Sequence, residues 1–75
     1  MTEHKIMLRF DETDEFVRMA NKCDFDIDIY YNRYIVDAKS ILGVMGLDFS
    51  HVLNVRYAGY NSAFEYYLNR FAIAC

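Results

Sequence analysis

A short alternating segment constrains the fold of this 75-residue chain more than any other feature. The segment is DFDIDIYYN, residues 24–32, in which apolar and acidic side chains alternate: Phe25, Ile27 and Ile29 against Asp24, Asp26 and Asp28. A period of two is typical of a β-strand with one buried face. Because the other face carries aspartates, it is expected to face water, as in an antiparallel sheet that helices cover on one side only.

Similar patterns predict the remaining elements. Alternation predicts strands at 5–10, 34–36 and 53–57, and apolar residues at helical spacing predict helices within 11–23, 37–47 and 62–71. Asp11 or Thr13 is expected to cap the first helix, because a side-chain oxygen there accepts from unpaired N–H groups of the first turn. A turn at Asn32 and Arg33 is expected to join two strands as a hairpin.

The last helix and the order of elements complete the predicted fold. Ser62 with Glu65 forms a capping-box pattern at the start of that helix, and Asn61 is the alternative cap. The order β-α-β-β-α-β-α, with one wet sheet face, predicts an α+β open-faced sandwich in which a four-stranded antiparallel sheet carries three helices on one face. We expect residues 1–75 to form this one domain.

Composition narrows the classes of function. The net charge is −3, with only eight Lys and Arg, which argues against nucleic-acid binding. No apolar run approaches the roughly 20 residues of a membrane span, and the N-terminus lacks the apolar core of a signal peptide, so we expect a cytoplasmic protein that does not bind membranes. Cys23 and Cys75 form no CxxC motif and are expected to be reduced thiols.

The segment VDAKSILGVMGL, residues 36–47, predicts a short helix with an unusual hydroxyl near its start. With Asp37 as the N-cap and Gly46 as the end, Ser40 would lie in the first turn, where free N–H groups and the helix dipole favour a phosphate. The charge of Asp37 would oppose that phosphate, and Lys39 would compensate in part.

The apolar residues of the same helix cover a wide arc. Ile41, Leu42, Val44 and Met45 spread over roughly 160°, whereas packing on one sheet needs a stripe of about 100°. Some of them are therefore expected to stay exposed as a patch that docks a partner. The alternative is that Ser40 is merely a tolerated serine and that the apolar residues belong to the core.

The segment VDAKSILGVMGL closely resembles the second helix of the HPr family, the small phosphocarriers of the bacterial sugar phosphotransferase system, around their regulatory serine. The preceding KCDFDIDIYYNRYIVDAKS and FVRMANKC extend the resemblance over about residues 16–47. The resemblance implies the same open-faced sandwich. It also implies that Ser40 is the position that a Gram-positive HPr kinase phosphorylates. The apolar patch that contacts enzymes and a transcriptional regulator corresponds to Ile41, Leu42, Met45 and Leu47.

The resemblance fails at the family's phosphorylated histidine. A gapless alignment places Arg9 at the histidine position and Asp11 at the position of an arginine that supports the phosphate. Arginine cannot carry a phosphoryl group in this chemistry, and the acidic residues Glu12, Asp14 and Glu15 repel phosphate. His4 and His51 are interpreted as surface histidines rather than displaced phosphoacceptors.

Other candidate sites are weaker. Asp24, Asp26 and Asp28 begin like a calcium loop, but the positions that need glycine and glutamate hold Ile29 and Ile35. The seven tyrosines are more simply explained by packing than by base stacking, because no basic groove accompanies them. No catalytic constellation, metal site or cofactor motif emerges, so we expect a protein that is not an enzyme and needs no cofactor.

Three functional hypotheses follow. The first is an HPr-like, non-catalytic regulatory protein without histidine phosphotransfer, switched by phosphorylation of Ser40 and bound by protein partners such as an HPr kinase, a transcriptional regulator or phosphotransferase-system components. The second is an interaction module that has left that system. The third, and weakest, is a phosphocarrier that uses an atypical site, His4 or His51. The sequence leaves the oligomeric state open.

Overall fold

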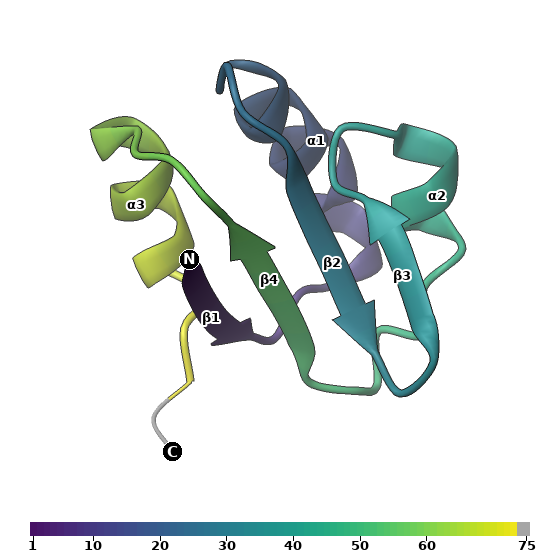
Figure 1. Cartoon of the computed structure of the whole chain (residues 1–75). Helices are drawn as coiled ribbons and strands as arrows, with labels where there is room; N and C mark the ends of the chain where they lie inside the picture. The colour runs from purple at the N-terminus through teal and green to yellow at the C-terminus, as the bar shows by residue number, and fades with distance from the viewer. Residues whose placement is uncertain (74–75) are drawn as a thin grey trace.

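The structure, a computed structural model, describes residues 1–73 and has the predicted α+β open-faced sandwich fold (Figure 1). Its elements follow the predicted order, with one added 3-10 turn: β1 (Thr2–Ile6), η1 (Phe10–Glu12), α1 (Thr13–Asn21), β2 (Ile27–Tyr31), β3 (Tyr34–Asp37), α2 (Ile41–Met45), β4 (Leu53–Tyr57) and α3 (Ser62–Asn69). No helix within residues 1–73 is long and apolar enough to cross a membrane.

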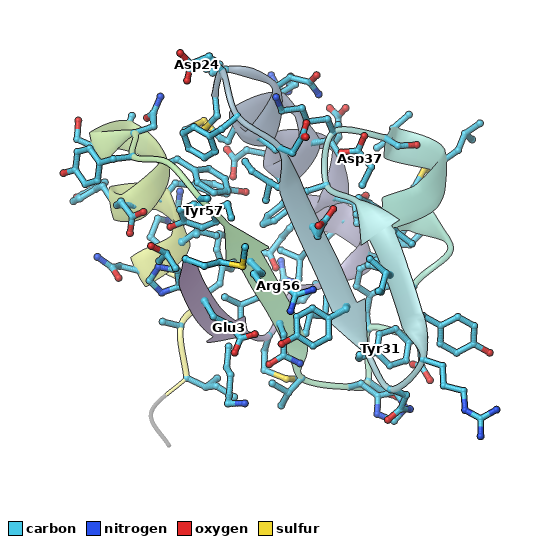
Figure 2. All side chains as sticks on the ribbon, viewed as in Figure 1. Glu3, Asp24, Tyr31, Asp37, Arg56 and Tyr57 are labelled. Carbon is cyan, nitrogen blue, oxygen red and sulfur yellow. The ribbon has the colours of Figure 1, made fainter. Side chains whose placement is uncertain are left out.

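The four strands form one antiparallel sheet in the order β1-β4-β2-β3. Along the central strands, alternate residues are buried beneath the helices: Ile27, Ile29, Leu53, Val55 and Tyr57. The residues between them face the opposite side, which no helix covers, and Figure 2 shows Glu3 and Arg56 on this open face. The alternation is confirmed over residues 27–29, where Ile27 and Ile29 are fully buried and Asp28 is not, but β2 begins only at Ile27, and Phe25 before it is half-buried.

The hairpin between β2 and β3 turns where the sequence predicted. Tyr31 pairs with Tyr34, so Asn32 and Arg33 make the two-residue connection. Asn32 has a positive φ of 52°, a conformation that asparagine tolerates better than most residues. This tolerance explains how the hairpin forms without a glycine at the turn.

The prediction for the first strand is wrong at both ends. We expected a strand over 5–10 with Phe10 on its buried side, but β1 ends at Ile6, opposite Leu53 at the start of β4. No residue of β4 is left to pair beyond that point, so the chain leaves the sheet, and the N–H of Met7 donates to the carbonyl of Phe71 instead. Leu8 is still buried, whereas Phe10 is 55% exposed at the start of η1.

Two helix caps also differ from expectation. Glu12, rather than Asp11 or Thr13, precedes α1, and no side chain caps it. The Thr13 hydroxyl donates to the carbonyl of Phe10 at 2.8 Å, which fixes the turn from η1 into α1. At α3 the alternative cap is confirmed and the Ser62–Glu65 capping box is wrong, because Asn61 Oδ1 accepts from the N–H of Phe64 at 2.9 Å.

One core lies between the sheet and the helices. It includes the predicted stripe of α3 and an aromatic cluster with rings 5.0–6.2 Å apart, formed by Phe16, Tyr57, Phe64, Tyr67 and Phe71. Cys23 is buried and its thiol is free, and burial raises its pKa. Cys75 lies outside the described residues.

Candidate functional site

Ser40 is the N-cap residue of α2, not a residue of its first turn. Its backbone is extended, with φ −101° and ψ 111°, and its Oγ accepts from the N–H of Gly43 at 3.3 Å. Its carbonyl accepts the first intrahelical hydrogen bond, from the N–H of Val44 at 3.0 Å. The side chain of Ser40 is exposed to solvent at the start of α2.

The prediction of Asp37 as the cap of α2 is therefore wrong. Asp37 is the last residue of β3, beside the turn that leads into α2 (Figure 2). Its Oδ1 accepts from the N–H of Lys39 at 2.9 Å, and its carbonyl accepts from the N–H of Ser40 at 3.0 Å. The N–H of Ala38 meanwhile bonds to β2, through the carbonyl of Ile27. The chain therefore uses Ala38, Lys39 and Ser40 to pass from the end of β3 to the start of α2. For this reason the N-cap of α2 is Ser40 rather than Asp37.

Lys39 contacts α1 rather than the site of the expected phosphate. Its Nζ donates to the carbonyl of Cys23 at 2.9 Å, just after the end of α1. The side-chain amide of Asn21 donates to the carbonyl of Lys39 at 3.2 Å. These two bonds fix the turn before α2 against the end of α1, so Lys39 has a structural role in addition to its charge.

Three of the four residues predicted for a partner-binding patch are exposed on α2. Leu42 is 82% exposed, Met45 is 41% exposed and Ile41 is 36% exposed. We call these three residues the α2 patch. Leu47, predicted as the fourth, is only 7% exposed and belongs to the core, because the chain has already turned inward after Gly46.

The histidine position of the resemblance holds an arginine paired to an acid. Arg9 Nε and Nη2 lie 3.1 Å and 3.2 Å from the two carboxylate oxygens of Asp11, and both side chains are exposed. The backbone N–H of Arg9 donates to Glu12 at 2.9 Å. The Glu12 carboxylate therefore already takes the N–H group that precedes η1, and the negative charges of Asp11 and Glu12 oppose a phosphate there.

An exposed aromatic pair beside Arg9 was missed at the sequence level. The ring of Phe10 packs edge-on against Phe49, with centroids 5.9 Å apart. Phe49 is half-buried and packs on the core, whereas Phe10 projects from η1. The available signal was that charged residues, Arg9 and Asp11, flank Phe10 on both sides, which is typical of an exposed turn as well as of a strand.

His4 takes part in a network between β1, β4 and α3. Its Nε2 lies 3.2 Å from Glu65 Oε1, and its ring stacks beside Tyr57 with centroids 6.1 Å apart. The Tyr57 hydroxyl donates to the other oxygen of Glu65, and burial together with this bond raises the pKa of Tyr57. His4 thus joins the edge strand to the first turn of α3, where its Nε2 faces a carboxylate.

His51 lies in the loop before β4. Its Nε2 is 3.3 Å from Asp48 Oδ2, and its ring stacks on Tyr31 with centroids 5.1 Å apart. Hydrogen bonds from Ser50 lower the pKa of Asp48, and the proximity of His51 adds to this effect. The backbone N–H groups of Asp48, Ser50 and His51 already donate to Tyr31 or Asp48, so they are not free to hold a phosphate on His51.

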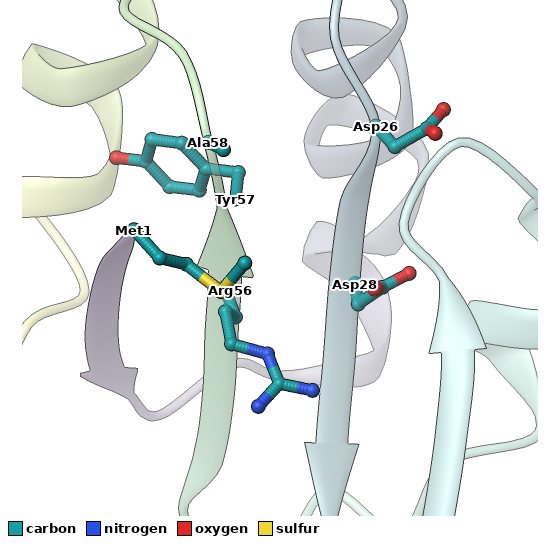
Figure 3. A pocket seen from close by; sticks show the side chains of 6 residues that line it. All are labelled: Met1, Asp26, Asp28, Arg56, Tyr57 and Ala58. Atoms are coloured by element: carbon teal, nitrogen blue, oxygen red, sulfur yellow. The ribbon is translucent and has the colours of Figure 1, made fainter.

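A shallow hollow of about 230 Å³ lies on the open sheet face (Figure 3), lined by Met1, Asp26, Asp28, Arg56, Tyr57 and Ala58. The two aspartates point away from Arg56 in this view. Arg56 instead lies over the ring of Tyr30, 4.7 Å from its centroid. Among the described residues, no group of three His, Cys, Asp or Glu side chains is arranged to hold a metal ion. The charged groups of the hollow do not converge on one point.

Comparisons with known proteins agree with this architecture. A family model described as the PTS HPr component phosphorylation site matches residues 8–57. The crystal structure of Crh, the catabolite repression containing protein of Bacillus subtilis, superposes with a TM-score of 0.65 over 93% of this chain and 88% of Crh, at 22% identity. That structure is an intertwined dimer formed by domain swapping. No curated protein sequence matches this chain.

Proposed function

The chain belongs to the HPr family of the phosphotransferase system, and from this membership we propose that it is a non-enzymatic regulatory member whose signal is a phosphate on Ser40. Members of the family act in sugar transport and its regulation as phosphocarriers. The proposal of a serine switch rests on the residues around Ser40, which resemble the HPr family, and on the residues around Arg9, which differ from it.

The accessibility of Ser40 supports the proposal most directly. Ser40 is exposed at the start of α2, its hydroxyl makes one weak hydrogen bond with Gly43, and the α2 patch begins at the next residue. A protein kinase needs an exposed hydroxyl on a segment whose local structure can yield. A five-residue helix with a single side-chain cap meets that need.

Phosphorylation would change the charge beside the α2 patch by about −1.5 to −2 at pH 7. Asp37 lies in the same turn and would repel the phosphate, and the amine of Lys39 is already bonded to the carbonyl of Cys23. The added charge would therefore be poorly neutralised by this chain itself. A partner protein that contacts the apolar side chains and supplies a cation would distinguish the two states.

The region around Arg9 supports the loss of histidine phosphotransfer. Arg9 is paired with Asp11, its backbone N–H is bonded to Glu12, and both histidines of the chain make other contacts. The partners we propose are an HPr kinase, a transcriptional regulator or phosphotransferase-system components, in the cytoplasm. The resemblance in fold to Crh, a catabolite repression protein, is compatible with this reading.

The first experiment is phosphorylation of the purified protein by an HPr kinase with ATP, with the site mapped by mass spectrometry. Ser40→Asn is the matched control, because asparagine keeps a side-chain cap at this position but cannot be phosphorylated. We expect label on Ser40 in the natural chain and none in the variant. Absence of label on the folded natural chain would reject the serine switch for that kinase.

A second assay separates the switch from phosphotransfer. Labelling driven by phosphoenolpyruvate through the phosphotransferase enzymes should leave this chain unlabelled. Label on His4 or His51 would contradict the proposal and identify an atypical phosphocarrier.

A further inference from the structure

The two edges of the sheet differ in how they are covered. The outer strands are β1 and β3. β1 carries the polar side chains of Glu3, His4 and Lys5, and the segment that follows α3 runs along its outer side, where the N–H of Ile73 donates to the carbonyl of Lys5 at 3.1 Å. Charged side chains and a covering segment are two ways in which proteins protect a sheet edge. The β1 edge is therefore partly closed to a further strand.

The outer edge of β3 lacks this protection. No residue of β3 is buried, and the side chains of Tyr34 and Ile35 are 62% and 63% exposed. Only Asp37, at the end of the strand, is charged. Figure 1 shows β3 at the border of the sheet, with α2 on the side that the helices cover. An exposed and largely apolar edge strand is a template for pairing with another strand.

The hydrogen bonds of the β2–β3 hairpin show which groups of β3 face outward. In an antiparallel pair, residues that bond across the ladder alternate with residues whose N–H and C=O point away from it. The N–H of Ala38 donates to the carbonyl of Ile27 on β2, so Ile35 and Asp37 belong to the outward set. The carbonyl of Asp37 accepts from Ser40 in the next turn. Among residues 1–73, no backbone partner is found for the two outward N–H groups or for the carbonyl of Ile35.

We propose that the outer edge of β3 pairs with the same edge of a second copy of this chain, so that two sheets continue as one across a two-fold axis. The axis would pass between the two Ile35 residues, and the paired strands would run antiparallel. Each Ile35 would donate to and accept from its counterpart, and the N–H of Asp37 would reach the carbonyl of Arg33 in the second copy. The inference goes beyond the proposed function, because it does not require a phosphate on Ser40.

The side chains that would lie opposite each other in this register are complementary. Arg33 would face Asp37 of the second copy on both sides of the axis, and Tyr34 would face Val36. Opposite charges, and aromatic side chains opposite β-branched ones, stabilise cross-strand pairs. Among residues 1–73, no carboxylate forms an ion pair with Arg33. An axis at Val36 would instead place the apolar Ile35 opposite Asp37, so the register about Ile35 is favoured.

The first test follows association as a function of protein concentration. A contact of one short strand from each copy is small, so we expect a weak dimer that sedimentation equilibrium detects at high concentration. Hydrogen exchange measured by NMR locates the contact. The amide N–H groups of Ile35 and Asp37 should exchange more slowly as the concentration rises, whereas those of β1 should not change. A chain that stays monomeric at millimolar concentration would overturn the proposal.

A matched pair of substitutions tests the location. Ile35→Lys places two like charges opposite each other at the axis, and Tyr66→Lys makes the same change of charge at a side chain on α3 that is 76% exposed. We expect only Ile35→Lys to weaken the dimer, by at least about tenfold. Circular dichroism establishes that both variants are folded. An equal effect of the two substitutions on the dimer would contradict the proposed edge.

An exchange of charges tests the register. Arg33→Asp would set acid against acid in its own dimer, and Asp37→Arg would set base against base, so each variant alone should stay monomeric where the natural chain dimerises. In an equal mixture the two should form a heterodimer, because acid and base again lie opposite each other on both sides of the axis. Circular dichroism is needed here as well, since Asp37 also accepts from the N–H of Lys39. Folded variants that do not associate in the mixture would exclude this register.

Other modes of association give different results. A dimer that Ile35→Lys leaves unchanged, or slower exchange centred on another element, would overturn the proposal and indicate a different contact, such as the exchange of a segment in the Crh dimer. Ser40→Asn should dimerise as the natural chain does. A failure of the β3 pairing therefore leaves the serine switch untouched, and a failure of the kinase assay leaves this inference untouched.

Discussion

At the scale of single residues, Ser40 combines a structural and a proposed regulatory role in one hydroxyl. As the N-cap of α2 it satisfies the N–H of Gly43, one of the donors that the start of a helix leaves unpaired. The same oxygen is the proposed acceptor of a phosphate. The contribution of the cap to the free energy of unfolding has to be measured first. Otherwise a loss of stability in a variant without the hydroxyl could be mistaken for a loss of phosphorylation.

Replacing Ser40 by Ala should lower the free energy of unfolding by about 1 kcal/mol, because the cap is lost, whereas Ser40→Asn should leave it nearly unchanged. Urea denaturation of the three proteins, followed by circular dichroism, measures the difference. Equal stability of Ser40→Ala and the natural chain would mean that the 3.3 Å hydrogen bond contributes nothing.

At the scale of elements, the loop between β4 and α3 depends on a glycine. Gly59 has a positive φ of 157°, and a Cβ built there would lie 2.4 Å from the ring of Phe25. Phe25 in turn stacks on Tyr57, with centroids 5.5 Å apart. The glycine therefore lets the loop pass closely over the residue that covers the end of β4.

Replacing Gly59 by Ala should destabilise the protein by roughly 1–3 kcal/mol, because the added methyl group forces Phe25 or the loop to move. Gly46→Ala is the control. Gly46 has a negative φ, and its nearest recorded atom lies 3.6 Å from a built Cβ, so alanine should be tolerated there. Thermal unfolding of both variants tests the contrast, and an equal effect would refute the steric explanation.

At the scale of the whole molecule, hydroxyls buried in the helix–sheet interface link stability to alkaline pH. Tyr57, on β4, and Tyr67, on α3, are both buried, and burial is the main cause that raises the pKa of each above the ordinary 10.0. Tyr57 also donates to Glu65, which contacts His4 on β1. One network therefore connects an edge strand, a central strand and a helix.

The stability of the folded chain should fall as the pH rises above about 10. There the unfolded chain releases the tyrosine protons and the folded chain still holds them, so the folded state binds more protons and loses stability with each unit of pH. Urea denaturation between pH 8 and about pH 11.5 measures the slope. Tyr57→Phe should flatten it, even though the variant is less stable at neutral pH because Glu65 loses its donor. An unchanged slope in that variant would exclude Tyr57 as a contributor.

Much of the site could be located from the sequence, but not its details. The wide apolar arc of segment 36–47 predicted that part of the helix stays in water, and the resemblance to the HPr family named Ile41, Leu42 and Met45, which are exposed. The cap at Ser40 and the burial of Leu47 depend on how many residues the chain needs to leave β3 and to turn after α2, and local spacing does not contain that number.

The sequence by itself determined the wet and dry faces of the sheet, the order of the elements and the position of the hairpin, since these follow from the period of side chains and from the tolerance of Asn32 for a positive φ. Tertiary structure alone decided where β1 ends and where Phe10 lies. A strand continues only while a neighbouring strand offers N–H and C=O groups, and β4 begins at Leu53, opposite Ile6. Alternation continues past that point without a partner, so the same pattern that buries Ile6 leaves Phe10 in water.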